Sequence, residues 1–319
     1  MSFVFVLASL FLVLGMQWFS ENLKNLFNPI SPEKNNFLGG IAESANLNPA
    51  ENSADIKVPF RNLQIENPEI SAESAIVVET NLSDSPDGVL FKKEGAKKLS
   101  IASLTKLMTA IVALEVYSPM ENITISKNAS LQQGKQGSLT EGDKMSVKDL
   151  LYIMLIDSSN QAACAISEGK GEQNFVAMMN QKAREIGLLN TYLADPSGLS
   201  SENSSTTEDL VKLTEYLLKN YPIITEISRT KELDLYKSDG SFYGKLNNTN
   251  ELLGEIPEII GGKTGFTTDA KGCLLLVLNN PANNDYLIYV ILGADDRFKE
   301  MKNLIDWINK AYTYDSSHI

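Results

Sequence analysis

Histidine is almost missing from this chain, because the 319 residues include only His318, next to the C-terminus. A Ser-His-Asp mechanism is therefore close to excluded, and any nucleophilic serine needs a different base, such as lysine. Basic residues are also scarce, with 28 Lys and Arg against 40 Asp and Glu and a net charge of −12. No basic cluster is interleaved with aromatic residues, so the composition argues against nucleic acid as a partner.

Cysteine is limited to Cys164 and Cys273. The two would pair only if the fold brought them together. Both lie within apolar runs of the sequence, so we expect two buried thiols rather than a disulfide.

Charged side chains are absent from the first 20 positions, where an apolar run extends from Phe3 to Phe19. Its length is at the short end for a membrane-spanning helix. A cleaved signal peptide would begin with basic residues and end at a small-x-small site, and neither is present. We therefore expect residues 1–20 to be a retained membrane anchor, with a buried helix as the less favoured alternative. The missing basic residues leave its orientation open.

A proline-rich stretch follows, with five of the 11 prolines between residues 29 and 68. Asn, Ser, Ala and Glu fill the gaps without any sustained period. This composition predicts a flexible linker over residues 21–69, followed by one folded domain over residues 70–315.

Strand patterns lie at both ends of that domain and helical patterns in its middle. Short apolar runs around a turn at 85–88 predict a hairpin, and two longer runs near the C-terminus predict adjacent antiparallel strands. The expected strands are residues 75–78, 89–91, 273–278 and 286–292. The expected helices are residues 103–116, 146–156, 161–168, 175–186, 207–217 and 301–308. The pattern predicts an α/β (α+β) domain, in which an antiparallel sheet is flanked by helices and carries a helical subdomain.

The sequence Ser103-Leu104-Thr105-Lys106 opens the most apolar of these helices. Residues three apart lie on one face of a helix, so the lysine amine can take the proton of the serine hydroxyl. We expect both side chains to be half buried, beside the free N–H groups of the first turn. The same spacing occurs at three other places, which shows that the spacing alone is weak: Ser31 and Lys34, Ser167 and Lys170, and Ser228 and Lys231.

Two further short motifs follow in order. Ser158 and Asn160 lie in the loop between two predicted helices, where alternate side chains face one cleft, although helix capping alone would explain them. Lys263-Thr264-Gly265 occurs once and precedes a predicted strand. A phosphate-binding P-loop ending here would need glycine at position 257, which is Pro257, so we reject that alternative. The remaining alternative for this motif is a glycine-rich turn with an exposed lysine.

Taken together, these three motifs resemble those of the penicillin-recognising serine acyl-transferases. Within this group the chain is similar to the D-alanyl-D-alanine carboxypeptidases of the low-molecular-mass penicillin-binding proteins, the S11 peptidase family. The similarity covers about residues 70–315. One departure is Ser100, where many members have proline; another is that the C-terminal β domain and amphipathic anchor of many relatives do not follow. The N-terminal segment would then provide the anchor. The similar segments are residues 101–110, 141–143, 190–191, 195–199, 263–267, 292–294 and 297–298.

The resemblance implies a β-lactamase/transpeptidase-like fold and a reaction without metal or cofactor. Ser103 would be the nucleophile, Lys106 its base and Ser158 a proton relay, while the N–H groups of Ser103 and Phe266 would form the oxyanion hole. The implied substrate is a peptidoglycan stem peptide, whose terminal carboxylate would meet Thr264, Thr267 and Arg297, and β-lactam antibiotics would acylate the same serine. The full implied binding set is Asn160, Lys263, Thr264, Gly265, Phe266, Thr267 and Arg297.

The implied setting is cell-wall maturation, with the catalytic domain on the periplasmic or wall side of the cell membrane. Three alternatives remain. A D,D-endopeptidase would use the same residues on cross-links. A β-lactamase would need a glutamate that positions water, and no Glu-x-x-x-Asn lies in a suitable loop. An inactive wall-binding protein would not need all three motifs intact.

Overall fold

The computed structural model describes residues 59–82, 88–134, 138–237 and 239–314. The predicted anchor over residues 1–20 and most of the predicted linker lie outside these ranges. Within them, none of the helices combines the length and the apolar character that crossing a membrane requires.

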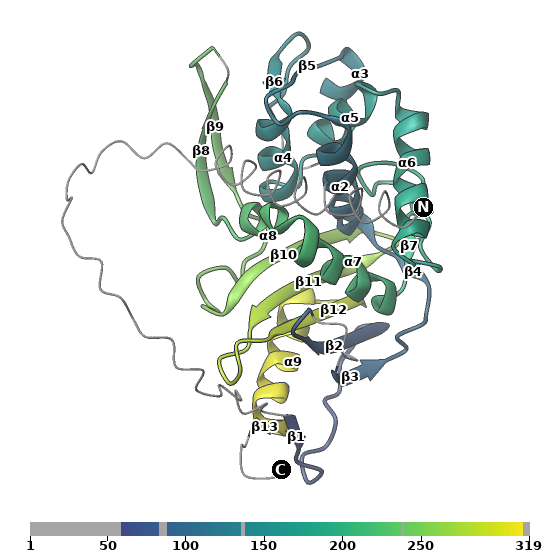
Figure 1. The fold of residues 1–319 in the computed structure, drawn as a ribbon, viewed down its shortest axis with the longest axis vertical. Coiled ribbons are helices and arrows are strands. Elements are labelled where there is room, and N and C mark those ends of the chain that lie inside the picture. The colour runs from purple at the N-terminus through teal and green to yellow at the C-terminus, as the bar shows by residue number, and fades with distance from the viewer. Residues whose placement is uncertain (1–58, 83–87, 135–137, 238, 315–319) are drawn as a thin grey trace, which may run out of the picture.

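A five-stranded antiparallel sheet forms the centre of the fold, in the order β10-β11-β12-β2-β3 (Figure 1). The predicted hairpin and the predicted pair of C-terminal strands are both confirmed, as β2–β3 and β11–β12. Strand β12 joins these two pairs by lying between β11 and β2, so the two ends of the domain build one sheet. The strands are β2 (Ser74–Thr80), β3 (Gly88–Lys93), β10 (Ile259–Thr267), β11 (Lys271–Asn279) and β12 (Tyr286–Ala294).

Alternate side chains of the sheet enter two separate cores. In β12, Ile288 and Val290 belong to the core on the side of the helical subdomain. Their neighbours Tyr289 and Ile291 pack with helix α9 (Arg297–Ala311) on the opposite face. A sheet covered on both faces has apolar side chains in both directions, which is why β11 and β12 read as continuous apolar runs.

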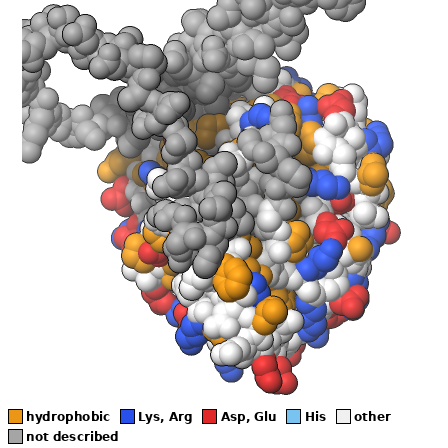
Figure 2. Space-filling model, turned by 60° about the horizontal axis from the view of Figure 1, so that its bottom comes forward, with side chains coloured by type: hydrophobic (Ala, Val, Ile, Leu, Met, Phe, Trp, Pro, Cys, Tyr) orange, Lys and Arg blue, Asp and Glu red, His pale blue; other side chains and the backbone are white. Residues whose placement is uncertain are grey.

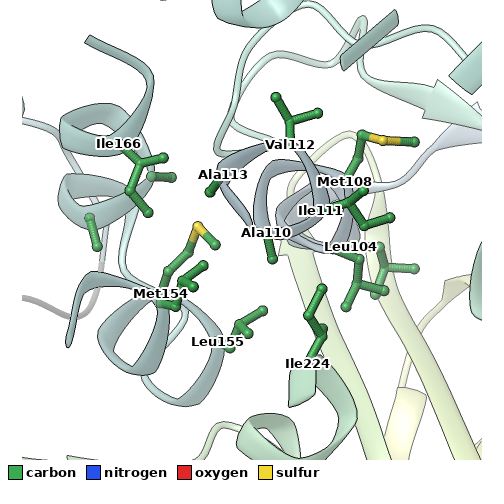
Figure 3. Packing of buried hydrophobic residues seen from close by; sticks show 14 of the residues in the cluster. Leu104, Met108, Ala110, Ile111, Val112, Ala113, Met154, Leu155, Ile166 and Ile224 are labelled. Carbon is green, nitrogen blue, oxygen red and sulfur yellow. The ribbon is translucent and has the colours of Figure 1, made fainter. Parts of the chain in front are cut away.

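The helical subdomain is built around α2 (Lys106–Val116), in which every residue from Lys106 to Leu114 is buried. Side chains from α4, α5 and α8 surround it on several sides (Figure 3). A helix enclosed in this way positions the residues at its N-terminus rigidly, because its whole circumference is packed. The remaining helices are α3 (Lys127–Ser130), α4 (Val147–Ile156), α5 (Asn160–Glu168), α6 (Glu172–Glu185), α7 (Thr207–Asn220) and α8 (Pro222–Ser228).

Four small two-stranded sheets complete the described part of the chain. These small sheets, strand β10 and helices α3 and α8 were not predicted. The strands of the small sheets are short or lack strict alternation, and the two helices have only four and seven residues. The hairpin of β8 (Glu232–Tyr236) and β9 (Phe242–Asn247) stands beside the helical subdomain in Figure 1. The other pairs are β1 (Pro59–Arg61) with β13 (Tyr312–Tyr314), β4 (Leu99–Ser100) with β7 (Ser204–Ser205), and β5 (Asn122–Thr124) with β6 (Lys144–Ser146).

Residues 59–61, which the sequence assigned to the linker, form strand β1, and the residues after them pack against the domain. Strand β1 pairs with β13, and the Arg61 guanidinium lies 4.7 Å from the ring centre of Trp307. The Trp307 indole N–H donates to the Glu66 carbonyl at 2.7 Å. Prolines in this stretch favour extended backbone, which suits an edge strand as well as a linker, so composition alone did not separate the two.

Surface charge and cysteine chemistry agree with the sequence. Acidic and basic side chains are interspersed over the face in Figure 2, with no continuous basic patch in that view. The two cysteines agree with the sequence prediction as well. Cys164 and Cys273 are both buried and free, which confirms the prediction of two buried thiols. Burial raises the pKa of the Cys273 thiol to about 11, so it stays protonated.

Candidate active site

The three sequence motifs meet at one groove of about 500 Å³. The 3₁₀ turn η1 (Ala102–Thr105), the loop between α4 and α5, and strand β10 form its walls. Eight of the ten predicted site residues line it, and the other two, Lys106 and Lys263, are buried behind it. The lining residues are Ser103, Gly134, Asp157, Ser158, Asn160, Gly198, Leu199, Thr249, Thr264, Gly265, Phe266, Thr267 and Arg297.

Ser103 lies in the 3₁₀ turn, and the α-helix begins only at Lys106. The sequence predicted a helix from Ser103 onward. The difference arises at Ala102, which has φ +46° and so turns the backbone just before the serine. A left-handed conformation in a residue other than glycine is strained and persists where its surroundings hold it. Gly198 packs against this turn so closely that an added Cβ would lie 2.0 Å from the Ala102 carbonyl oxygen.

Lys106 is fully buried rather than half buried as predicted, with no exposed surface. Its Nζ lies 2.9 Å from Ser103 Oγ, 2.7 Å from Asn160 Oδ1 and 2.6 Å from the Ser197 carbonyl oxygen. Two of these partners can only accept hydrogen bonds. A neutral amine would donate its two protons to them and direct its lone pair at the Ser103 hydroxyl, which is the arrangement a base requires.

Burial lowers the pKa of Lys106 to about 7, and the nearby charge of Asp195 opposes that shift. Removing an ammonium from water disfavours the charged form, and none of the described carboxylates lies within hydrogen-bonding distance to restore it. A lysine with this pKa is partly neutral near neutral pH, so it can accept a proton from a serine.

Asp195 belongs to one of the segments that resemble the family, residues 195–199, but the resemblance implied no role for it. Its carboxylate accepts hydrogen bonds from the backbone N–H groups of Ser197, Gly198 and Ser200, at 2.6–2.7 Å. Burial disfavours the charge on Asp195, but these hydrogen bonds outweigh it and hold the pKa of the carboxyl below its usual value. The carboxylate thereby fixes the loop that brings the Ser197 carbonyl to Lys106.

Asn160 connects the base to the other wall of the groove. Its Oδ1 accepts from Lys106 while its Nδ2 donates to the Gln133 carbonyl at 2.7 Å, which fixes the orientation of the amide. The neighbouring Ser159 caps helix α5, because its hydroxyl accepts from the Ala162 N–H at 3.3 Å. Within this motif, Ser159 caps the helix, while its neighbours Ser158 and Asn160 line the groove.

Ser158 and Lys263 form a second serine–lysine pair across the groove, with 2.7 Å between Oγ and Nζ. Ser158 has φ +61°, a strained conformation held by the loop before α5. Lys263 is 1 % exposed, and burial together with the charges of Lys106 and Arg297 lowers its pKa well below the usual value. Lys263 lies on β10 itself, whereas the sequence predicted only that a strand would follow Lys-Thr-Gly. The strand that follows is β11 and not the helix that a P-loop requires, so the P-loop alternative is wrong.

The far end of the groove offers donors to an anion. Arg297, half buried at the first turn of α9, lines the groove, and its Nε has no hydrogen-bond partner among the described residues. Thr264 Oγ1 lies 2.6 Å from Thr249 Oγ1. The sequence gave no reason to single out Thr249. Gly265 lets β10 approach η1, because an added Cβ would meet the Ile101 carbonyl at 3.0 Å.

The residues described in and around the groove form no group of three metal-ligating side chains. The one such group in the described ranges is Cys164, Glu168 and Glu172, at the end of α5 and the start of α6. Burial and the two nearby carboxylates raise the pKa of the Cys164 thiol to about 12. A thiol must be deprotonated to bind a metal, so this surrounding disfavours it as a ligand.

The comparisons with known proteins agree with this geometry. A family model described as D-alanyl-D-alanine carboxypeptidase (Peptidase S11) matches residues 61–296. This chain belongs to that family. D-alanyl-D-alanine carboxypeptidase DacF of Bacillus subtilis is 33% identical over 253 residues, which cover 76% of this chain and 63% of the relative. A D-alanyl-D-alanine endopeptidase of Escherichia coli is 32% identical over 250 residues, covering 76% of this chain and 78% of the relative.

The solved structures agree on the fold. The crystal structure of the Streptomyces K15 DD-transpeptidase has 26% sequence identity and a TM-score of 0.69, and the match covers 77% of this chain and all of that one. The predicted transpeptidase-like fold, an antiparallel sheet flanked by helices, is therefore confirmed. The chain spans 63% of the length of the Bacillus carboxypeptidase, so activity and substrate are taken up as proposals.

Proposed function

We propose that the chain is a serine-type D-Ala-D-Ala carboxypeptidase that removes the terminal D-alanine of peptidoglycan stem peptides. The observation that carries this proposal is the Lys106 amine. It is buried, it lies 2.9 Å from Ser103 Oγ, and its pKa is lowered to about 7. With that pKa, roughly three quarters of the side chain is neutral at pH 7.5.

In the proposed acylation, the Ser103 hydroxyl gives its proton to Lys106 as Oγ bonds to the carbonyl carbon of the penultimate D-alanine. The carbonyl oxygen becomes negative and is held by the N–H groups of Ser103 and Phe266. Losing one such donor typically costs about 2.7–4 kcal/mol of transition-state stabilisation. The C–N bond then breaks, and Ser158, which Lys263 holds at 2.7 Å, passes its proton to the leaving amine. The proton that Lys106 accepted replaces it, so Ser158 is a hydroxyl and Lys106 a neutral amine again. Water later hydrolyses the ester.

Substrate orientation is assigned to both ends of the groove. Asn160 holds the substrate amide, while Arg297, Thr264 and Thr267 bind the terminal carboxylate. The unpartnered Arg297 Nε supports this assignment, because a buried donor without a partner is costly unless a ligand supplies one. β-Lactam antibiotics, which carry a carboxylate beside a strained amide, would acylate Ser103 in the same orientation.

A D,D-endopeptidase that cuts cross-links is the second candidate. It is favoured by relatives named D-alanyl-D-alanine endopeptidase in Escherichia coli and Pseudomonas aeruginosa, each 32% identical to this chain. The two activities break the same kind of bond and differ in what is attached to the leaving amine. The residues of the groove serve either one.

Labelling with a fluorescent penicillin tests the nucleophile. We expect a stable label on the wild type, none on Ser103→Ala, and an unchanged label on the matched control Ser167→Ala, which alters another Ser-x-x-Lys pair. Absence of label on the wild type would refute the enzyme and favour a wall-binding protein. A label lost within one turnover cycle would indicate a β-lactamase.

Product analysis by mass spectrometry separates the two peptidase activities. A carboxypeptidase releases free D-alanine from a pentapeptide, whereas an endopeptidase splits a cross-linked dimer into two stems. Cleavage of the dimer alone would reject the primary proposal and retain the second.

We also propose that residues 1–20 anchor the chain in the cell membrane, with the catalytic domain on the periplasmic or wall side. The proposal rests on the uncharged N-terminal run and on a substrate found outside the cytoplasm. Membrane fractionation of the full chain against a chain lacking residues 1–20 tests it. Equal release of both into the soluble fraction would contradict it.

A further inference from the structure

Two aromatic side chains stand exposed at the end of the β8–β9 hairpin. Tyr236 and Phe242 are paired across the hairpin, and each is 57% exposed. Their ring centres are 5.3 Å apart with the planes inclined by 60°. Two adjacent exposed rings offer an apolar surface to a ligand, and aromatic residues are common anchors of binding surfaces.

The hairpin is held in a fixed position next to the groove. At its base, the Asn247 N–H donates to Asp157 Oδ1 at 2.7 Å, and Asp157 lines the groove. Near its end, Lys237 forms a 2.6 Å ion pair with Asp143, and Tyr243 Oη accepts from the Ser138 N–H at 3.2 Å. These ties to the helical subdomain pre-organise the aromatic pair, which lowers the entropy cost of binding.

We propose that Tyr236 and Phe242 dock the glycan strand that carries the stem peptide during the reaction. This inference rests on the proposed function, because it identifies a second contact with the same substrate polymer. The C–H faces of sugar rings stack on aromatic rings, and their hydroxyl groups need polar neighbours. Asp239 and Ser241 provide these beside the rings, where the Asp239 carboxylate accepts from the Ser241 N–H at 2.9 Å.

The length of β9, from its contact with the groove residue Asp157 to the aromatic pair, is close to the length of a stem peptide. Strand β9 runs from Asn247 at the groove to Phe242, five residue steps at about 3.3 Å, or about 17 Å in all. A stem pentapeptide has four residues between the sugar and the scissile bond, which extend over about 14 Å. A stem whose last residues lie in the groove therefore brings its sugar to within reach of the rings.

Other occupants of the pair fit less well. A stable interface with a second copy of the chain needs about 800 Å² on each partner, far more than two side chains supply. An anionic lipid surface attracts basic segments, whereas this hairpin carries Glu232, Asp234 and Asp239. Its lysines Lys237 and Lys245 are already in ion pairs with carboxylates.

The test compares the double variant Tyr236→Ala/Phe242→Ala with the wild type on two substrates, a free pentapeptide and intact peptidoglycan sacculi. We expect kcat/KM on sacculi to fall about tenfold, equivalent to about 1.4 kcal/mol, while the free pentapeptide is hydrolysed as before. Phe60→Ala is the matched control: Phe60 is 64% exposed on β1, at the opposite end of the molecule in Figure 1, and its loss should change neither rate.

Equal losses on both substrates, or no loss on sacculi, would overturn the inference. Co-sedimentation with sacculi in a Ser103→Ala background tests docking without catalysis, and peptide-free glycan strands should compete with it only when the aromatic pair is present. If the wild type hydrolysed neither substrate, the proposed function would be rejected instead. The co-sedimentation result would still decide whether the aromatic pair docks the glycan strand. Loss of wild-type dimerisation or vesicle binding in the double variant would assign the pair to another partner and overturn it.

Discussion

The pH dependence of Ser103 acylation follows directly from the surroundings of Lys106. The reaction needs the neutral amine, whose fraction increases as the pH rises through a pKa of about 7. That fraction falls from about nine tenths at pH 8 to about one tenth at pH 6. The wild-type rate should follow it. Holding the pKa there costs about 5 kcal/mol relative to an exposed lysine, at 1.36 kcal/mol per unit.

Asn160→Asp perturbs this pKa with almost no change in shape. It places a carboxylate oxygen where the amide oxygen now lies, 2.7 Å from Lys106 Nζ. An opposite charge at that distance favours the ammonium and raises its pKa by about 1–3 units. The midpoint of the rate profile should therefore move up to about pH 8–10, and acylation at pH 7 should fall by about fivefold for the smaller shift and about 500-fold for the larger one.

Stopped-flow acylation with a fluorescent penicillin from pH 5 to 10 measures both profiles. Asn220→Asp, the same substitution at the end of α7, is the control and should leave the midpoint unchanged. Lys263 also has a lowered pKa, so the wild-type profile alone does not identify the titrating group. A midpoint that stays at about pH 7 in Asn160→Asp would refute the assignment of Lys106 as the base.

Three further outcomes are expected. Lys106→Met should abolish acylation and should also stabilise the fold in a pH-dependent way. Between about pH 7 and 10.4 the unfolded wild type binds one more proton at Lys106 than the folded protein does, so wild-type stability rises with pH. The stability advantage of the Met variant, measured by urea unfolding, should therefore shrink over this range by up to about 5 kcal/mol. Gly198→Ala should cost about 1–3 kcal/mol and lose acylation, because its Cβ would meet Ala102. Gly187→Ala has a similar positive φ but open space around the Cβ, so its acylation should be normal. Ile111→Ala in the fully buried α2 should lower the free energy of unfolding by about 2–5 kcal/mol.

The sequence carried enough information to predict four of the five strands of the central sheet and the three motifs, because these depend on local patterns. Long apolar runs predicted β11 and β12, and the spacing of apolar residues predicted α4 and α9, each within a few positions. What it did not predict depends on contacts between distant segments. The β8–β9 hairpin lacks strict alternation, and Thr249 joins the groove only because its loop packs beside β10.

The base itself is the best example of such a non-local property. Ser167 and Lys170 have the same spacing as Ser103 and Lys106, but Lys170 is one third exposed and lies 3.9 Å from a carboxylate of Glu121. That lysine is in contact with water and has an acidic partner. Lys106 has neither, because the Ser197 loop and Asn160 enclose it with acceptors that a neutral amine satisfies. The chemistry therefore resides in the enclosure formed by segments up to 91 residues away, and a serine–lysine spacing becomes a nucleophile and base only where the fold supplies that enclosure.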